Sequence, residues 1–166
     1  GNSLNYGWDW SSGAFTEGTW NPRLTVYDDS GLSSSETIFM GIDRTGPTMS
    51  TPTISATGWQ SQENATISDL QSSADDGLGS GVHSVEYSLN NVDWNATSED
   101  SIRVNVQEGN TQIWFRAVDN IGNTGGTIST NISSDFTAPE GIRWVVDELT
   151  TSRIGVANVS YLAERS

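Results

Sequence analysis

The sequence contains no cysteine and no lysine, and its seven positively charged residues are all arginines. The absence of cysteine excludes disulfides and thiolate metal sites, and it leaves the redox compartment open. The absence of lysine excludes Lys–Asn isopeptide cross-links and Schiff-base chemistry, because both need the amine. With 21 acidic residues the formal net charge is −14, which disfavours nucleic acid and anionic lipid as partners and favours divalent cations or a salty medium.

Long apolar runs and targeting signals are missing as well. No stretch approaches the roughly 20 apolar residues of a membrane-spanning helix, so direct membrane insertion is not expected. The chain begins at Gly1 with neither an initiator methionine nor a signal-peptide pattern, which indicates a mature piece or a fragment. Its 166 residues are enough for one domain of ordinary size or two small ones.

Internal repetition is the most informative property of the sequence. Three pairs of segments match at shifts of 91 or 92 residues: 43–47 with 135–139, 24–31 with 115–122, and 67–70 with 159–162. The first pair shares the pattern D-x-T-x-P. Three agreeing shifts are unlikely to arise by chance, and the unit length is close to the roughly 100 residues of an immunoglobulin-type sandwich.

Within one unit the sequence indicates strands rather than helices. Residues 112–118 alternate as a half-buried strand does, with the inner face expected to hold Ile113, Phe115 and Ala117. The equivalent inner residues of the earlier copy are Pro22, Leu24 and Val26. A second strand is expected with Val85, Tyr87 and Leu89 inside. Further strands, separated by turns rich in Gly, Asn, Asp and Ser, are expected around Ile54, Ile67, Ile102, Val104 and Val106.

Residues 115–126 read FRAVDNIGNTGG, a strand that breaks into oxygen-bearing side chains and glycines. The segment could form a metal loop, a catalytic corner or a tight turn. Asp and Asn side chains bond backbone amides two residues on, and Gly122 adopts a positive φ without strain. The earlier copy keeps Asp28 and Gly31 but replaces the amides. A turn leading into a partner strand at 127–132 is therefore the favoured interpretation.

Residues 46–138 resemble the immunoglobulin-like repeats of bacterial and archaeal cell-surface and secreted proteins. Two motifs carry the resemblance, DGLGSGVHSVEYSLN at 76–90 and RAVDNIGNT at 116–124, and the D-x-T-x-P linker before each unit also fits. The resemblance implies an all-β fold of tandem immunoglobulin-like or fibronectin-III-like sandwiches. It says little about function, because such repeats serve as spacers, adhesive stalks, surface-layer modules and appendages of secreted hydrolases.

The unit boundaries leave two incomplete repeats. Residues 1–45 resemble the second half of a unit, 46–138 form a complete unit, and 139–166 resemble the opening strands of a further one. A half sandwich exposes its inner face, which here is expected to include Leu24, Val26, Ile38 and Met40.

Three arrangements of these ends remain open. The chain is a segment of a longer array, or the tail of one chain completes the head of the next and builds a homopolymeric filament by strand complementation, or both ends complete each other within one chain.

Carboxylates near the unit junctions are candidates for calcium, which prefers six to eight hard oxygen ligands and could stiffen a string of domains. The candidate ligands are Asp28, Asp29, Asp43, Asp75, Asp76, Asp119 and Asp135. No EF-hand or RTX-type spacing is present, and solvated acidic loops are the competing interpretation. No other cofactor is expected.

Two further kinds of surface site are suggested by residue type. Asn-X-Ser/Thr sequons, which would mark a glycoprotein, occur at Asn64, Asn95, Asn131 and Asn158, although a chain rich in Ser, Thr and Asn also produces them by chance. Tryptophans can stack on sugar rings, and the candidates are Trp8, Trp10 and Trp114, the last paired with Arg116 on an outer face. Aromatic residues more often fill sandwich cores.

No catalytic motif is found. His83 is the only histidine, and neither a nucleophile motif nor a phosphate-binding glycine loop accompanies it. The sequence therefore predicts a non-enzymatic, extracellular or cell-surface protein, a structural or adhesive part of a stalk, surface layer or filament, whose partners are other repeats of the same protein. The alternative is a non-catalytic, carbohydrate- or calcium-binding region of a large secreted hydrolase.

Overall fold

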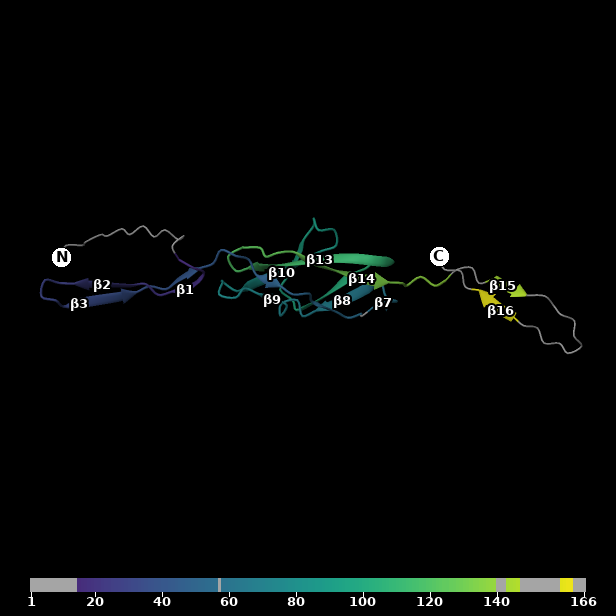
Figure 1. Ribbon diagram of the computed structural model, residues 1–166, viewed down its shortest axis with the longest axis horizontal. Helices are drawn as coiled ribbons and strands as arrows, with labels where there is room; N and C mark the ends of the chain where they lie inside the picture. Colours follow the sequence, from purple (N-terminus) through teal and green to yellow (C-terminus); the bar gives the residue numbers. More distant parts are fainter. Residues whose placement is uncertain (1–14, 57, 140–142, 147–158, 163–166) are drawn as a thin grey trace, which may run out of the picture.

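The computed structural model describes residues 15–56, 58–139, 143–146 and 159–162, and the only regular elements in these ranges are β-strands (Figure 1). Across these ranges no helix qualifies as a membrane span. Figure 1 shows the described parts in a row, with an N-terminal hairpin, a central sandwich and a C-terminal hairpin.

The central sandwich consists of two facing sheets and a short closing pair. The larger sheet has the order β11-β10-β13-β14-β7, and its strands are β7 (Trp59–Gln60), β10 (Val82–Ser88), β11 (Asn95–Thr97), β13 (Gly109–Asp119) and β14 (Ile128–Ser134). The smaller sheet has the order β12-β8-β6, with β6 (Thr53–Ile54), β8 (Asn64–Ser68) and β12 (Ser101–Asn105). The closing pair is β5 (Thr48–Met49) with β9 (Ala74–Asp75).

This strand order is that of an immunoglobulin-type sandwich, in which the first, second and fifth strands share one sheet and the third, sixth and seventh share the other. The first strand is divided here. Its opening part, β6, pairs antiparallel with β8, and its continuation, β7, runs parallel to the last strand, β14. The all-β, immunoglobulin- or fibronectin-III-like fold predicted from the sequence is therefore confirmed for this part of the chain.

The sandwich encloses one apolar core, formed where alternate residues of the two sheets face each other. The predicted alternation of β13 is correct, because Ile113, Phe115 and Ala117 are completely buried. The buried apolar residues are Ala65, Ile67, Leu70, Val85, Val104, Val106, Ile113, Phe115, Ala117 and Ile132.

The alternation predicted for the strand at 84–89 is wrong at its end. Leu89 is exposed, whereas Ser88 is completely buried. The reason is that β10 ends at Ser88, whose hydroxyl donates a hydrogen bond to the side-chain oxygen of Asn90 at 3.0 Å. The chain then enters a turn in which Asn91 has a φ of 57°, so Leu89 no longer belongs to the sheet.

The N-terminal hairpin is a paired ribbon without a facing sheet among the described residues. Its strands are β1 (Gly18–Trp20), β2 (Arg23–Tyr27), β3 (Ser33–Thr37) and β4 (Met40–Ile42). The predicted exposure of its inner face is observed at Leu24, Val26 and Ile38, which are 60%, 57% and 55% exposed. The expectation is wrong for Met40, which is half-buried where it lies opposite Trp20.

Both terminal hairpins repeat pairings of the central sandwich. The N-terminal hairpin follows β13–β14, with Gly18 opposite Ile42 as Gly109 is opposite Ser134, and Leu24 opposite Glu36 as Phe115 is opposite Ile128. The C-terminal hairpin, β15 (Arg143–Val146) with β16 (Val159–Leu162), follows β6–β8, with Val146 opposite Val159 as Ile54 is opposite Ile67. These equivalent residues are 91 or 92 positions apart.

Candidate functional site

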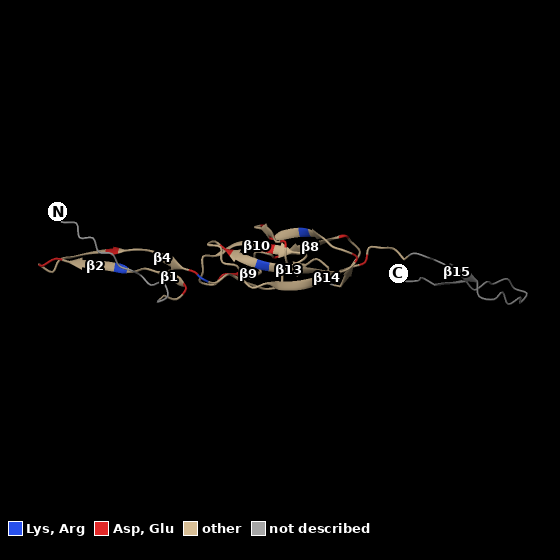
Figure 2. Cartoon of the chain, turned by 90° about the horizontal axis from the view of Figure 1, so that it is seen from above, with Lys and Arg blue, Asp and Glu red and all other residues tan. Residues whose placement is uncertain are grey.

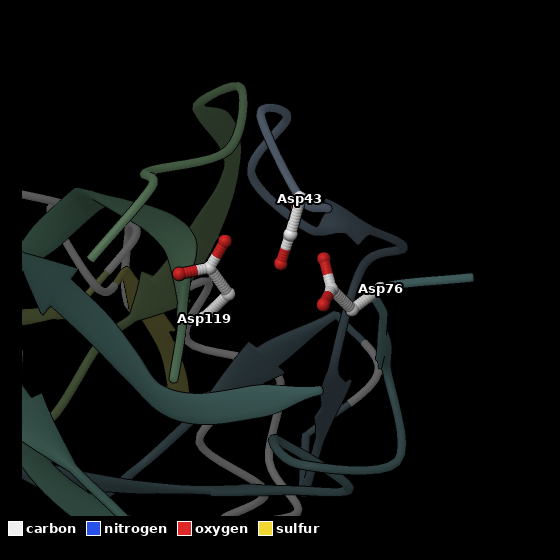
Figure 3. A group of neighbouring side chains, drawn as sticks. All are labelled: Asp43, Asp76 and Asp119. Carbon is white, nitrogen blue, oxygen red and sulfur yellow. The ribbon is translucent and has the colours of Figure 1, made fainter. Parts of the chain in front are cut away.

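Three carboxylates converge where the N-terminal hairpin meets the sandwich. Asp43 follows β4, Asp76 follows β9, and Asp119 ends β13. One oxygen from each lies within 4.8 Å of the others, and Figure 3 shows the three side chains close together, with the carboxylates of Asp43 and Asp76 facing each other. Three segments that are distant in sequence therefore bring three acidic groups to one joint.

Asp119 organises the turn that follows β13. One of its oxygens, Oδ1, accepts the N–H groups of Ile121 at 2.9 Å and Asn123 at 2.8 Å. The other oxygen, Oδ2, accepts the side-chain amide of Asn123 at 2.7 Å. Gly122 has a φ of 96°, as the tight turn requires. The turn interpretation of this segment is confirmed, and the carboxylate is a structural acceptor.

The same turn is built a second time at Asp28. Its Oδ1 accepts the N–H groups of Ser30 and Leu32, both at 2.9 Å, and Gly31 has a φ of 82°. The donors stand two and four residues after the aspartate, as they do after Asp119. The parts that the two sequence copies retain, Asp and Gly, are thus the parts that form the turn.

Two opposing effects act on the pKa of Asp119, whose residue is 1% exposed. Burial raises this pKa, but hydrogen bonds from the backbone and side chain of Asn123 and from the N–H of Ile121 lower it. The pKa of Asp119 lies below its ordinary value of 3.8, so the group carries its negative charge at neutral pH.

Asp43 and Asp76 are held by the loop at residues 79–81, within the motif at 76–90. The N–H of Ser80 donates to Oδ2 of Asp43 at 2.6 Å, and the N–H of Gly81 donates to Oδ2 of Asp76 at 2.7 Å. A Cβ at Gly79 would collide with the carboxylates of both aspartates. This loop therefore accepts the carboxylates only because glycine stands at position 79.

The joint is also packed sterically. Pro47 is completely buried, and a Cβ added at Gly125 would overlap its carbonyl oxygen. A Cβ at Gly46 would overlap the backbone of Thr124 in the same way. The D-x-T-x-P segment after β4 is thus pressed against the turn after β13, so its proline belongs to the end of the sandwich.

A glutamate clamp fixes the D-x-T-x-P segment at two places in the chain. At the first, Glu17 accepts the N–H of Arg44 and the hydroxyl of Thr45, both at 2.9 Å. At the second, Glu108 accepts the N–H of Phe136 at 3.2 Å and the hydroxyl of Thr137 at 3.0 Å. The sequence interpretation missed these glutamates, although each precedes a glycine of positive φ at equivalent positions, Gly18 and Gly109.

The structure brings together only three of the seven predicted calcium ligands. Asp28 and Asp29 lie in the hairpin turn, Asp75 accepts the N–H of Gly77 at 2.9 Å, and Asp135 follows β14 at the other end of the sandwich. Figure 2 shows acidic residues along the turns and at both ends of the sandwich. The four remaining aspartates do not join the cluster, and calcium binding stays a prediction confined to Asp43, Asp76 and Asp119.

The predicted pairing of Trp114 with Arg116 is wrong. The guanidinium of Arg116 lies 4.0 Å from the ring centre of Trp94, and its Nε forms an ion pair with Glu86 at 2.6 Å. Residues two apart on a strand are separated by nearly 7 Å, whereas the loop before β11 folds Trp94 over the sheet. Sugar stacking by half-buried Trp114 stays a prediction, and Trp8 and Trp10 lie outside the described residues.

The predicted glycosylation sites differ in accessibility. Asn95 on β11 and Asn131 on β14 are exposed, whereas Asn64 is half-buried on β8 opposite Asn105. Asn158 lies outside the described residues. Glycosylation stays a prediction at all four positions.

Comparison with known proteins gives little further information. No protein-family model matches the chain, and no curated protein matches it. Among solved structures, the fibronectin(III)-like modules of Clostridium thermocellum CbhA are similar at 13% identity and a TM-score of 0.38. That similarity covers 72% of this chain and 65% of the other chain.

The lowered pKa of Asp119 predicts an acid-sensitive turn. The stabilising hydrogen bonds of its carboxylate are fully present above the ordinary pKa of 3.8 and are lost as the pH falls through the lower pKa of the folded state. Asp119→Asn should therefore destabilise the protein at pH 7 and reduce the loss of stability between pH 4 and pH 2. Urea unfolding monitored by circular dichroism measures both effects. Exposed Asp135→Asn serves as the control, and an unchanged pH profile in Asp119→Asn would contradict the assignment.

Calcium binding at the three-aspartate cluster predicts a metal-dependent melting temperature. Millimolar Ca²⁺ should raise the melting temperature by a few degrees, since a ligand bound only to the native state stabilises it. Asp43→Asn should abolish the increase, and Asp135→Asn should not. Equal melting temperatures in calcium and in chelator would remove the calcium interpretation.

Proposed function

We propose that this chain is a structural part of an extracellular or cell-surface protein, built from tandem immunoglobulin-like units and without catalysis of its own. The observation that carries the proposal is the duplicated glutamate clamp. Glu17 and Glu108 hold equivalent D-x-T-x-P segments through the same two kinds of donor. A joint that occurs twice at one spacing is expected in a protein whose units are linked in series.

The matched strand registers support the same organisation. The N-terminal hairpin follows the pairing of β13–β14, and the C-terminal hairpin follows that of β6–β8. Residues 1–45 and 139–166 are then parts of units like the complete one at 46–138.

The mechanical role follows from how the joint is held. On its N-terminal side, the D-x-T-x-P linker is hydrogen-bonded to Glu17, which belongs to the hairpin that precedes the linker. On the other side, Asp43 accepts the N–H of Ser80 and Pro47 is buried in the end of the sandwich. A linker fixed to both neighbouring parts limits bending, which suits a stalk, a surface layer or a fibre that holds something away from an envelope.

The acidic surface fits an extracellular setting. A net charge of −14 keeps the protein soluble and favours association with divalent cations. Calcium between Asp43 and the pair Asp76 and Asp119 would add a further link between the hairpin and the sandwich, because the first ligand comes from one part and the others from the next. Glycans at Asn95 and Asn131 would cover exposed strand surface.

The second candidate is a non-catalytic accessory region of a large secreted hydrolase. The observation that favours it is the group of half-buried aromatic residues on the outer face of the larger sheet, Trp94 and Trp114. The ring of Trp94 is already covered on one side by Arg116, so this surface offers less for sugar stacking than two free rings. Binding of soluble polysaccharides, measured by calorimetry, distinguishes this candidate from the stalk.

The proposed serial arrangement predicts an elongated particle. A compact protein of 166 residues has a radius of gyration of about 15 Å. Small-angle X-ray scattering at low protein concentration should give a clearly larger value, with a long tail in the distance distribution. A radius of gyration near that of a compact globule would overturn the serial arrangement.

The glutamate clamp predicts protection of the linker from trypsin. In Glu17→Ala, cleavage after Arg44 should become roughly fivefold faster, as expected when about 1 kcal/mol of local hydrogen bonding is lost. Glu17→Gln keeps one acceptor oxygen and should show a smaller increase. Mass spectrometry resolves this site because the chain has only seven tryptic residues. Exposed Glu99→Ala is the matched control, and equal cleavage rates in all variants would exclude the clamp.

A further inference from the structure

One face of the N-terminal hairpin carries apolar side chains that no other described strand covers. More than half of Leu24 and of Val26 on β2 is exposed, and the residues opposite them on this face are Glu36 and Ser34. Ile38, directly after β3, is exposed as well. The equivalents of the two β2 residues on β13, Phe115 and Ala117, are completely buried. The same face of the sheet is thus exposed to solvent in the N-terminal hairpin and buried in the central sandwich.

In the central unit the covering surface includes the pair β6–β8. Ile67 of β8 is completely buried in the core, and Ile54 of β6 packs against it. The C-terminal hairpin reproduces this pair with the same register, since Val146 lies opposite Val159 and Val145 lies opposite Ser160. The described residues therefore include an exposed face in the N-terminal hairpin and, in the C-terminal hairpin, a strand pair with the register of the matching cover.

The cover cannot reach the face within one chain. The hydroxyl of Thr137 is bound to Glu108 at the start of β13, whereas Asp43 lies against Asp119 at its end. The 11 residues of β13 span about 36 Å. Residues 138–142, which lead to β15, span at most about 18 Å even when fully extended. The two hairpins accordingly stand at opposite ends of the sandwich in Figure 1.

We propose that the C-terminal hairpin of a second copy covers the face of the N-terminal hairpin that exposes Leu24 and Val26, so that copies join head to tail. The inference rests on the tandem organisation proposed above. The contact is heterologous, because the two surfaces differ, and its repetition gives an open chain of molecules rather than a closed dimer. Each contact completes a sandwich like the central one.

The charge of the chain sets the conditions of association. Two copies of net charge −14 repel each other, and this repulsion is screened at about 1 M salt, where the Debye length is about 3 Å. Sedimentation velocity in high salt should show a mass that increases with protein concentration. The same protein should sediment as a smaller species in low salt.

Two variants test the two surfaces separately. Val26→Asp places a charge on the uncovered face, and Val159→Asp places one on the covering hairpin. Each variant alone should associate more than about tenfold more weakly than the original chain, because a buried unpaired charge is costly. Mixed in equal amounts, they should form a dimer and nothing larger, since the intact tail of the first fits the intact head of the second.

Tyr27→Asp is the matched control. Tyr27 is 69% exposed on the same strand but points to the opposite face, so this variant should associate like the original chain. Val26→Ser provides a milder change at the test position, and circular dichroism of all variants verifies that the sandwich is folded.

Three results would overturn the inference. They are a monomer at all concentrations and salt conditions, a Val159→Asp variant that still self-associates, and an equimolar mixture that stays monomeric. Scattering that still shows an elongated monomer in these cases would leave the serial arrangement of units intact, so the two proposals fail separately.

Discussion

Carboxylates that accept backbone N–H groups hold together the irregular parts of this chain. Asp119 and Asp28 close two equivalent turns, and Glu17 and Glu108 hold two equivalent linkers. Strand pairing and the apolar core stabilise the sheets, but the conformation of the turns and linkers that connect the strands depends on these charged acceptors. Because hydrogen bonds to charged groups are stronger than neutral ones, a few carboxylates suffice where no core is available.

Local features of the fold could be predicted from the sequence because they depend on neighbouring residues. The alternation of β13 and the turn at Asp119 follow from side-chain parity and from the ability of Asp to bond amides shortly after it. The end of β10 could not be predicted this way, because Leu89 continues the alternation although Ser88 already bonds to Asn90 in the following turn.

Contacts between residues that are distant in sequence could not be predicted and became visible only in the structure. Asp43 is distant in sequence from Asp76 and Asp119, and only the packing of the linker against the sandwich brings them together. Trp94 contacts Arg116 because of the conformation of the loop before β11, and no periodic pattern in the sequence predicts that conformation. The glutamate clamp was hidden for another reason, since a single Glu before a Gly is too common in sequence to suggest a partner 27 to 29 residues away.

The recurrence of the clamp has a geometric consequence for any longer array. If each linker leaves one unit and enters the next through the same contacts, every unit is related to its neighbour by a single rotation and a single rise. Such a screw operation winds the units into a regular spiral whose pitch is set at one joint. A change at the position of Glu17 or Glu108 would then alter the handedness or spacing of the whole assembly rather than one contact.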